Sequence, residues 1–271
     1  MTAWLETHHG DAPLIVSFPH TGTDIPADLE RRMVSPWLAR MDADWWIDRL
    51  YGFARDLGAT TVRTTISRSV IDVNRDPSGA SLYPGQATTE LCPTTTFDGE
   101  PLYRPGEKPD AAEISARRDA WFQPYHDGLA AEIARLRAVH PRVVLYEAHS
   151  IRSVIPRLFD GELPNFNLGT NQGRTCAHDL TAAVEAACDA TPFSRVTDGR
   201  FKGGWTTRHY GRPDAGVHAI QMELACRGYM DDPAVPPTPG AWPSPYSETQ
   251  AAPMRAALTE VLKACLAFAH A

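Results

Sequence analysis

The stretch that decides the fold is RVVLYEAHSIRS, residues 142–153. After Arg142 come apolar, β-branched and aromatic residues, which favour a buried strand, and toward its end the stretch contains a glutamate, a histidine and an arginine. The pattern occurs twice more, because LIVSF at 14–18 leads to His20 and AIQM at 219–222 leads to Glu223. Three apolar runs that end in polar, titratable groups predict three strands whose ends build one site.

Helix patterns alternate with these strand patterns along the chain. Strands are predicted for residues 13–18, 59–66, 142–148 and 216–225. Helices are predicted for about 111–139, 175–190 and 247–269, and between the first two strands, where Trp46, Leu50, Phe53 and Leu57 share one apolar face. This alternation predicts an α/β fold with three layers, in which a mostly parallel or mixed central sheet carries helices on both faces.

Composition limits the classes of partner. The 271 residues are 43% hydrophobic and carry a net charge of −7, which argues against general nucleic-acid binding. The five cysteines form no CxxC pair, and the first residues, MTAWLETHHGDAP, lack the apolar core of a signal peptide. We therefore expect a cytoplasmic protein with no nucleic-acid or membrane partner. The sequence leaves the oligomeric state open.

The polar strand ends have the composition of a metal site. In open α/β sheets, ligands bind just beyond the carboxyl ends of the strands, so His20, His149 and Glu223 can converge although they lie far apart in the chain. A catalytic zinc takes three His, Asp or Glu ligands and keeps one position open for water. The two histidines are the first two candidates for these ligands.

The third ligand is expected to be a carboxylate. We choose Asp44, which stands in the first turn of the helix predicted after the first strand, and Asp42 and Asp24 remain alternatives. Glu223 is then left as the general base. Each feature also has an ordinary structural interpretation, since an acid in a first helical turn is by default a capping group and a single histidine is more often a surface residue.

Longer motifs carry a resemblance to a known family. The matching blocks are SFPHTGTDIP (17–26), DADWWIDRLY (42–51), ISRSVIDVNRDPSG (66–79), LYPGQATTELCPTTTFDGEPLY (82–103), YEAHSIRSVIPRLFDGELPNFNLGTN (146–171), GRFKGGWTTRHYGRP (199–213) and HAIQMELACRGYM (218–230). With these blocks the chain resembles the N-formylglutamate deformylase, or N-formylglutamate amidohydrolase, family. The resemblance covers essentially all of residues 1–271 and implies a single amidohydrolase domain.

The resemblance also implies a fold and a set of roles. The family is similar to zinc-dependent exopeptidases and to aspartoacylase, which share a phosphorylase/hydrolase-like fold. By this resemblance, His20, Asp44 and His149 are expected to hold the metal and Glu223 to act as catalytic base. One departure concerns the acidic ligand, because the related His-x-x-Glu pattern would place a glutamate where this chain has Thr23. Asp44 fits better with the zinc-dependent cell-wall amidases, whose acidic ligand begins the helix after the first strand.

The substrate that the resemblance implies is N-formyl-L-glutamate, hydrolysed to formate and L-glutamate in the last step of one route of histidine degradation. Its two carboxylates suit guanidinium partners. Asn74 and Arg75 resemble the Asn-Arg pair that holds the substrate carboxylate in aspartoacylase. Further candidates for substrate binding are Arg68, Arg152, Arg208 and His209.

The expected cofactor is one divalent metal ion, with zinc as first choice and cobalt, manganese or iron as alternatives. Within the same fold, the alternative function is a related N-acyl-amino-acid or peptidoglycan amidase. A non-catalytic binding protein would need a lost ligand or base, whereas both histidines and Glu223 are present. A cysteine hydrolase built on Cys226 is a weaker alternative, since no Cys-His arrangement can be recognised in the sequence.

Overall fold

One mixed sheet forms the centre of the molecule. The computed structural model describes residues 4–82, 85–233 and 235–271. Within them, seven strands form a sheet with the order β1-β3-β2-β4-β7-β5-β6. The strands are β1 (Leu5–His8), β2 (Leu14–Phe18), β3 (Thr60–Thr64), β4 (Val143–Ile151), β5 (Phe166–Gly169), β6 (Arg195–Thr197) and β7 (Val217–Ala225).

The helices are mostly short, apart from α4, α5 and α7. The α-helices are α1 (Ala27–Glu30), α2 (Ile47–Leu50), α3 (Ala111–Arg117), α4 (Gln123–Arg137), α5 (His178–Asp189), α6 (Trp205–Tyr210) and α7 (Glu248–His270). Single turns of 3₁₀-helix are η1 (Leu38–Arg40), η2 (Gly52–Arg55), η4 (Pro213–Ala215) and η5 (Cys226–Gly228), and a π-helical turn, η3 (Arg118–Phe122), joins α3 to α4. Among the described residues, no helix combines the length and the apolar character needed to cross a membrane.

The centre of the sheet brings the predicted strand ends together. The four predicted strands are present as β2, β3, β4 and β7, and β2, β4 and β7 are adjacent and parallel. Their carboxyl ends therefore lie at the same edge of the sheet. The sheet is mixed because β1 pairs with β3, and β5 with β7, in the antiparallel direction. The sequence patterns did not predict β1, β5 and β6, which are only three or four residues long.

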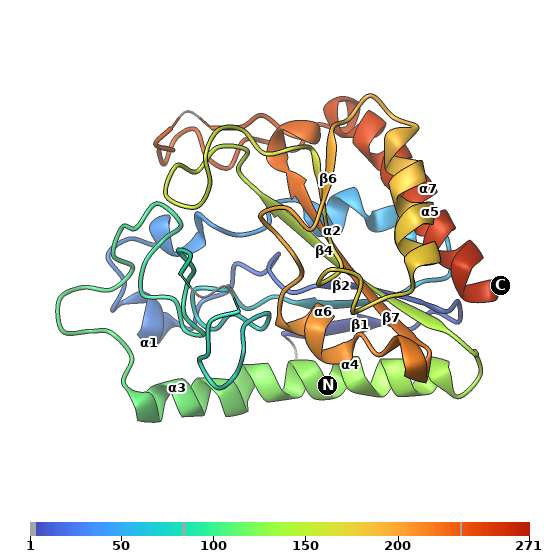
Figure 1. Cartoon of the computed structure of the whole chain (residues 1–271). Helices are drawn as coiled ribbons and strands as arrows, with labels where there is room; N and C mark the ends of the chain where they lie inside the picture. Colours follow the sequence, from blue (N-terminus) through green and yellow to red (C-terminus); the bar gives the residue numbers. More distant parts are fainter. Residues whose placement is uncertain (1–3, 83–84, 234) are drawn as a thin grey trace.

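Helices pack on both sides of this sheet. Figure 1 shows the green helix α4 along one side and the helices α5 and α7 on the other. The alternation of side chains along β4 serves both sides. Leu145 belongs to the apolar cluster that contains Leu129 of α4, whereas Val144 and Tyr146 belong to the cluster that contains Leu258 of α7. Every residue of β4 is buried, so its polar residues are buried as well.

The helix predicted across residues 42–57 is wrong. This segment forms only the single turns α2 and η2, and Trp46 has a positive φ of 65°, which interrupts a right-handed helix. The indole N–H of Trp46 donates to the carbonyl of Ser244 at 3.0 Å, so tertiary packing holds the backbone in this conformation. Asp44 therefore lies in the turn before α2, where its backbone N–H donates to the carbonyl of His20 at 2.9 Å.

The five cysteines are all free and buried. Burial raises the pKa of every one of these thiols. Cys226 is only 2% exposed and its Sγ faces the hydroxyl of Tyr229 at 3.7 Å. A buried thiol with a raised pKa is a poor nucleophile, so the structure gives no support to a cysteine hydrolase.

Candidate active site

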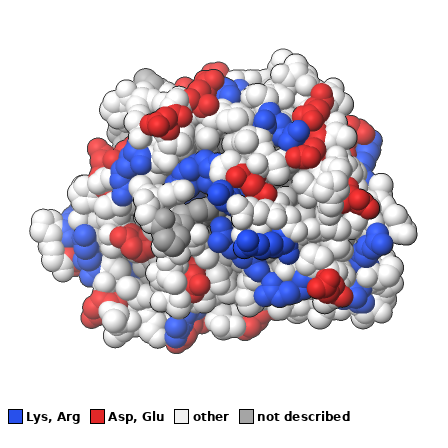
Figure 2. Space-filling model, viewed as in Figure 1, with Lys and Arg blue, Asp and Glu red and all other residues white. Residues whose placement is uncertain are grey.

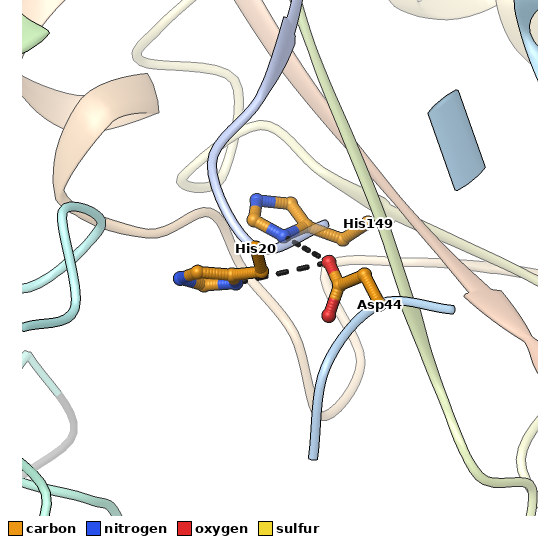
Figure 3. Close-up of side chains that lie close together, drawn as sticks. All are labelled: His20, Asp44 and His149. Carbon is orange, nitrogen blue, oxygen red and sulfur yellow. Dashed lines mark hydrogen bonds and ion pairs between the residues drawn. The ribbon is translucent and has the colours of Figure 1, made fainter. Parts of the chain in front are cut away.

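Three side chains that are far apart in the sequence meet at the carboxyl edge of the sheet. One nitrogen of His20, one nitrogen of His149 and one carboxylate oxygen of Asp44 lie within 4.8 Å of one another. Figure 3 shows both imidazole rings turned toward the Asp44 carboxylate. The Oδ2 atom of Asp44 is 3.0 Å from Nδ1 of His149 and 3.7 Å from Nδ1 of His20. All three residues are at most 3% exposed, so the cluster is shielded from bulk water.

His20 is oriented by a second carboxylate. It follows β2, and its Nε2 lies 2.7 Å from Oδ1 of Asp72, which accepts the ring N–H. The other ring nitrogen, Nδ1, is buried and makes no hydrogen bond with any described residue. Burial, followed by the charge of Arg68, lowers the pKa of His20 to about 4. The ring is therefore neutral near pH 7, and its Nδ1 lone pair is directed toward Asp44.

Asp44 and His149 form a buried pair. Burial alone would lower the pKa of His149, but its contacts with Asp44 and Glu147 outweigh burial and raise it to about 10. Burial likewise acts to raise the pKa of Asp44, and the hydrogen bond with His149 and the charge of His20 bring it below its ordinary value. A histidine binds a metal ion only when it is neutral, so a cation at this cluster would compete with a proton for Nδ1 of His149.

The donor set of the cluster fits a divalent transition metal. Two imidazole nitrogens and one carboxylate oxygen are zinc ligands, and Nδ1 of His20 and Oδ1 of Asp44 are both buried without a hydrogen bond to a described residue. The two alternative acids lie outside the cluster. Asp42 accepts the backbone N–H of Phe97 at 2.7 Å, and Asp24 makes a backbone bridge with Ile66.

Glu223 faces the same site from the neighbouring strand. In the parallel ladder of β4 and β7 it is the register partner of His149, so the two side chains lie on the same face of the sheet. Its Oε2 accepts a hydrogen bond from Nε2 of Gln221 at 3.2 Å. Burial raises the pKa of Glu223 to about 7. A carboxyl group with such a pKa can both accept and release a proton near neutrality.

A cavity of about 290 Å³ opens onto these residues. Its lining includes His20, His149 and Glu223. Three guanidinium groups also line it, those of Arg68, Arg75 and Arg200, together with the Asn74 side chain. In Figure 2 the surface is hollowed near the middle of the face shown, and Lys and Arg side chains lie at the border of the hollow. The cavity therefore combines a carboxyl group with a raised pKa, the candidate metal ligands and several positive charges.

The three cavity arginines are held differently. Arg68 is 7% exposed and donates to Oδ2 of Asp72 at 2.8 Å, which fixes it beside the histidine cluster. Arg75 is partly exposed and donates to the carbonyl and the hydroxyl of Thr89 at 3.2 and 3.1 Å. Arg200 donates to the carbonyls of Leu158 and Ala87 at 2.9 and 3.0 Å.

The remaining predicted substrate-binding residues have other partners. Arg152 donates to Oδ2 of Asp98 at 2.7 Å, and Arg208 donates to the carbonyl of Gly203 at 2.9 Å. The ring of His209 stacks on Trp205 with a centroid distance of 4.1 Å. The described residues that line the cavity do not include Arg152, Arg208 or His209.

The sequence patterns assigned no role to three further candidates. Asp72 orients His20 and stands two residues before Asn74 in the DVNRD motif, so its position in that motif was an available signal. Glu147 lies two residues before His149 on the same strand. Arg200 belongs to the segment between β6 and α6, where no periodic pattern singles out one arginine, and only the fold reveals that it reaches the cavity.

Comparisons with known proteins agree on one family. The model of the N-formylglutamate amidohydrolase family matches residues 12–230. The chain is 45% identical to a protein named N-formylglutamate deformylase from Pseudomonas aeruginosa over 265 residues, which are 97% of this chain and 96% of the relative. A protein of the same name from Pseudomonas putida is 43% identical over the same shares of both chains.

Solved structures share the fold. The crystal structure of N-formylglutamate amidohydrolase from Ralstonia eutropha superposes with a TM-score of 0.80 at 22% identity, covering 98% of each chain. A gene product from Agrobacterium tumefaciens superposes with a TM-score of 0.74 at 18% identity, covering 98% of this chain and 95% of the other. Family model, sequence relatives and fold lead to one conclusion: this chain belongs to the N-formylglutamate amidohydrolase family.

Proposed function

We propose that this protein hydrolyses the formamide bond of N-formyl-L-glutamate and releases formate and L-glutamate. The observation that carries the proposal is that a carboxylate with a pKa near 7, a His-Asp-His cluster and several guanidinium groups share one cavity. The names of the two Pseudomonas relatives support the substrate. The pathway role we propose is the last step of one route of histidine degradation.

We propose that His20, Asp44 and His149 hold one divalent cation, with zinc as first choice. Support comes from the donor set and from the buried nitrogen and oxygen that lack hydrogen bonds in the described chain. A divalent cation in such a site lowers the pKa of water and polarises a carbonyl group. Asp72 keeps the Nε2 proton of His20 in place, so that Nδ1 presents its lone pair to the site.

Glu223 is proposed to move the proton. Its carboxylate accepts a proton from the water that attacks the formyl carbon, and it then delivers this proton to the amide nitrogen as the carbon–nitrogen bond breaks. Both transfers need a group that is neither strongly acidic nor strongly basic. The pKa of about 7, raised by burial, meets this need.

The two substrate carboxylates are proposed to bind the arginines of the cavity. Arg75 and Arg200 are partly exposed and hold their guanidinium groups with carbonyl and hydroxyl acceptors. Arg68 is nearly buried against Asp72 and adds positive charge near the cluster. Asn74, next to Arg75 in the chain, lines the cavity and offers an amide to the same carboxylate.

Two further proposals concern the domain architecture and the cellular location. We propose that residues 1–271 form one amidohydrolase domain with the three-layer, zinc-exopeptidase-like arrangement. Helices on both sides of the mixed sheet support this proposal. A cytoplasmic location is proposed because all five thiols are free.

The substrate assignment is tested by measuring the free amino acid that purified, zinc-supplemented protein releases from each substrate. We expect N-formyl-L-glutamate to give the highest kcat/KM in a panel with N-acetyl-, N-succinyl-L-glutamate and N-formyl-L-aspartate. The formyl group is the smallest acyl group of the panel, and the cavity of about 290 Å³ must also hold two carboxylates. Faster release of acetate or succinate would favour the alternative, an N-acyl-amino-acid amidase on the same fold.

Carboxylate recognition is tested by Arg75→Lys. Lysine keeps the charge and loses the fork geometry, so we expect KM for N-formyl-L-glutamate to rise about 10- to 100-fold with a smaller change in kcat. Arg55→Lys is the matched control, because Arg55 is exposed and outside the cavity. Steady-state kinetics of both variants measure the difference. An unchanged KM in Arg75→Lys would remove Arg75 from the substrate site.

A further inference from the structure

Glu147 is a buried carboxylate without a hydrogen bond. It is 0% exposed, and neither of its oxygens has a hydrogen-bond partner among the described residues. Such a group is costly, since a buried carboxylate has lost its hydration and needs donors to replace it. The functional proposal above gives Glu147 no role, so its presence inside β4 requires a reason.

The geometry of β4 directs Glu147 toward a candidate metal ligand. Side chains two residues apart on a strand lie on the same face, so Glu147 and His149 are neighbours on one side of the sheet. The Oε2 atom of Glu147 lies 3.6 Å from Nε2 of His149. On this face Leu145 is apolar, and the strand becomes polar only toward its carboxyl end. Glu147 therefore faces Nε2 of His149, whereas Asp44 faces Nδ1 of the same ring.

The other neighbour of this nitrogen is a donor. Nδ2 of Asn74 lies 3.0 Å from Nε2 of His149. The orientation of the Asn74 amide is set by the backbone N–H of Thr206, which donates to Oδ1 of Asn74 at 2.9 Å. The NH₂ group of Asn74 therefore faces His149, and an NH₂ group cannot accept a proton from the ring.

A cation at Nδ1 of His149 leaves the ring proton on Nε2. That N–H needs an acceptor, and the Asn74 amide cannot supply one. The carboxylate of Glu147 is within reach after a shift of a few tenths of an ångström. His20 has the same arrangement already formed, with Asp72 accepting its Nε2 proton at 2.7 Å.

We propose that Glu147 is a positioning residue that accepts a hydrogen bond from the Nε2–H of His149 and so fixes the tautomer that presents Nδ1 to the metal ion. The proposal rests on the proposed role of His149 as a metal ligand. It also gives the unbonded oxygens of Glu147 a donor, the Nε2–H that His149 carries when a metal ion occupies Nδ1. Partners of this kind typically contribute 10- to 100-fold to metal affinity.

The test compares Glu147→Leu with Glu147→Gln in the full chain. Leucine removes the acceptor at similar volume, whereas glutamine keeps an uncharged carbonyl acceptor. We expect the dissociation constant for Zn²⁺, measured by competition with a chromophoric chelator, to rise about 10- to 100-fold in Glu147→Leu and by less in Glu147→Gln. The increase in Tm caused by zinc should shrink in the same order, because stabilisation follows the ratio of free metal to its dissociation constant.

Glu132→Gln is the matched control. Glu132 is also buried, at 6% exposure, but it pairs with Arg135 on α4 instead of a metal ligand. The zinc affinity of the Glu132→Gln variant should equal that of the wild type. Equal zinc affinity in wild type, Glu147→Leu and Glu147→Gln would overturn the proposal for Glu147 alone. A wild-type protein that binds no Zn²⁺ would overturn the proposed metal site and this inference together.

Discussion

Replacing Glu223 by glutamine is expected to lower kcat for formate release by about 10³-fold, within the range that general acid–base catalysis contributes. Glutamine has the shape of glutamate and can still hydrogen-bond, but it cannot take a proton from water at neutral pH. The zinc content should stay at the wild-type level, because Glu223 lies outside the group of His20, Asp44 and His149. Kinetics and metal analysis on the same preparation measure both effects.

Gln221→Leu is a suitable control for Glu223→Gln, because Gln221 contacts Glu223. Gln221→Glu is unsuitable, since it would add another buried negative charge beside Glu223. Gln221 donates to Oε2 of Glu223 and accepts the backbone N–H of Gly204 at 2.7 Å, so its loss should disturb Glu223 without removing the base. We expect a smaller fall in kcat than in Glu223→Gln. Activity of Glu223→Gln within a few-fold of wild type would show that another group moves the proton.

Removal of the metal ion is the second change that we expect to reduce activity strongly. Thorough chelation is expected to lower formate release by at least about 10³-fold, because the polarised carbonyl and the activated water are then lost together. Added zinc or cobalt should restore activity. Full activity in protein that elemental analysis shows to be free of metal would contradict a metal-dependent mechanism while leaving the substrate assignment intact.

A pair of variants distinguishes the acidic ligand. Asp44→Asn should lose zinc together with activity, since Asp44 lies 3.0 Å from His149 and belongs to the cluster. Asp42→Asn should keep its zinc, because the Asp42 carboxylate instead accepts the N–H of Phe97 and lies 3.3 Å from Arg152. Metal content after gel filtration is the measurement. Retained zinc in Asp44→Asn, or lost zinc in Asp42→Asn, would reverse the assignment.

The sequence could predict the centre of the sheet because short, continuous stretches of the chain determine its strands. Long apolar runs are buried on both sides, and each carries its polar group at a fixed place after the last apolar residue. Once β2, β4 and β7 are parallel neighbours, the meeting of His20, His149 and Glu223 follows from geometry alone. The resemblance to the family then supported Asp44, although the structure places it in a turn and not in a helix.

Other parts could not be predicted because distant residues decide them. The positive φ of Trp46 is maintained by a contact with Ser244, about two hundred positions along the chain, which no local window contains. The short strands β5 and β6 lack enough residues for a periodic pattern. Arg200 lines the cavity because of the path of its loop. Glu147 stands at the polar end of its strand, but only the fold shows that its carboxylate lies 3.6 Å from Nε2 of His149.

Because all five thiols are buried, their reaction with a reagent can report local unfolding of the core. A thiol reagent can react only when the surrounding core separates, so the rate of alkylation under native conditions measures that event without an added probe. Cys92 lies in the apolar cluster with α4, whereas Cys176, Cys188, Cys226 and Cys265 lie in the cluster with α5 and α7. Labelling resolved by peptide would therefore reveal whether the two sides of the sheet come apart in one step or one after the other.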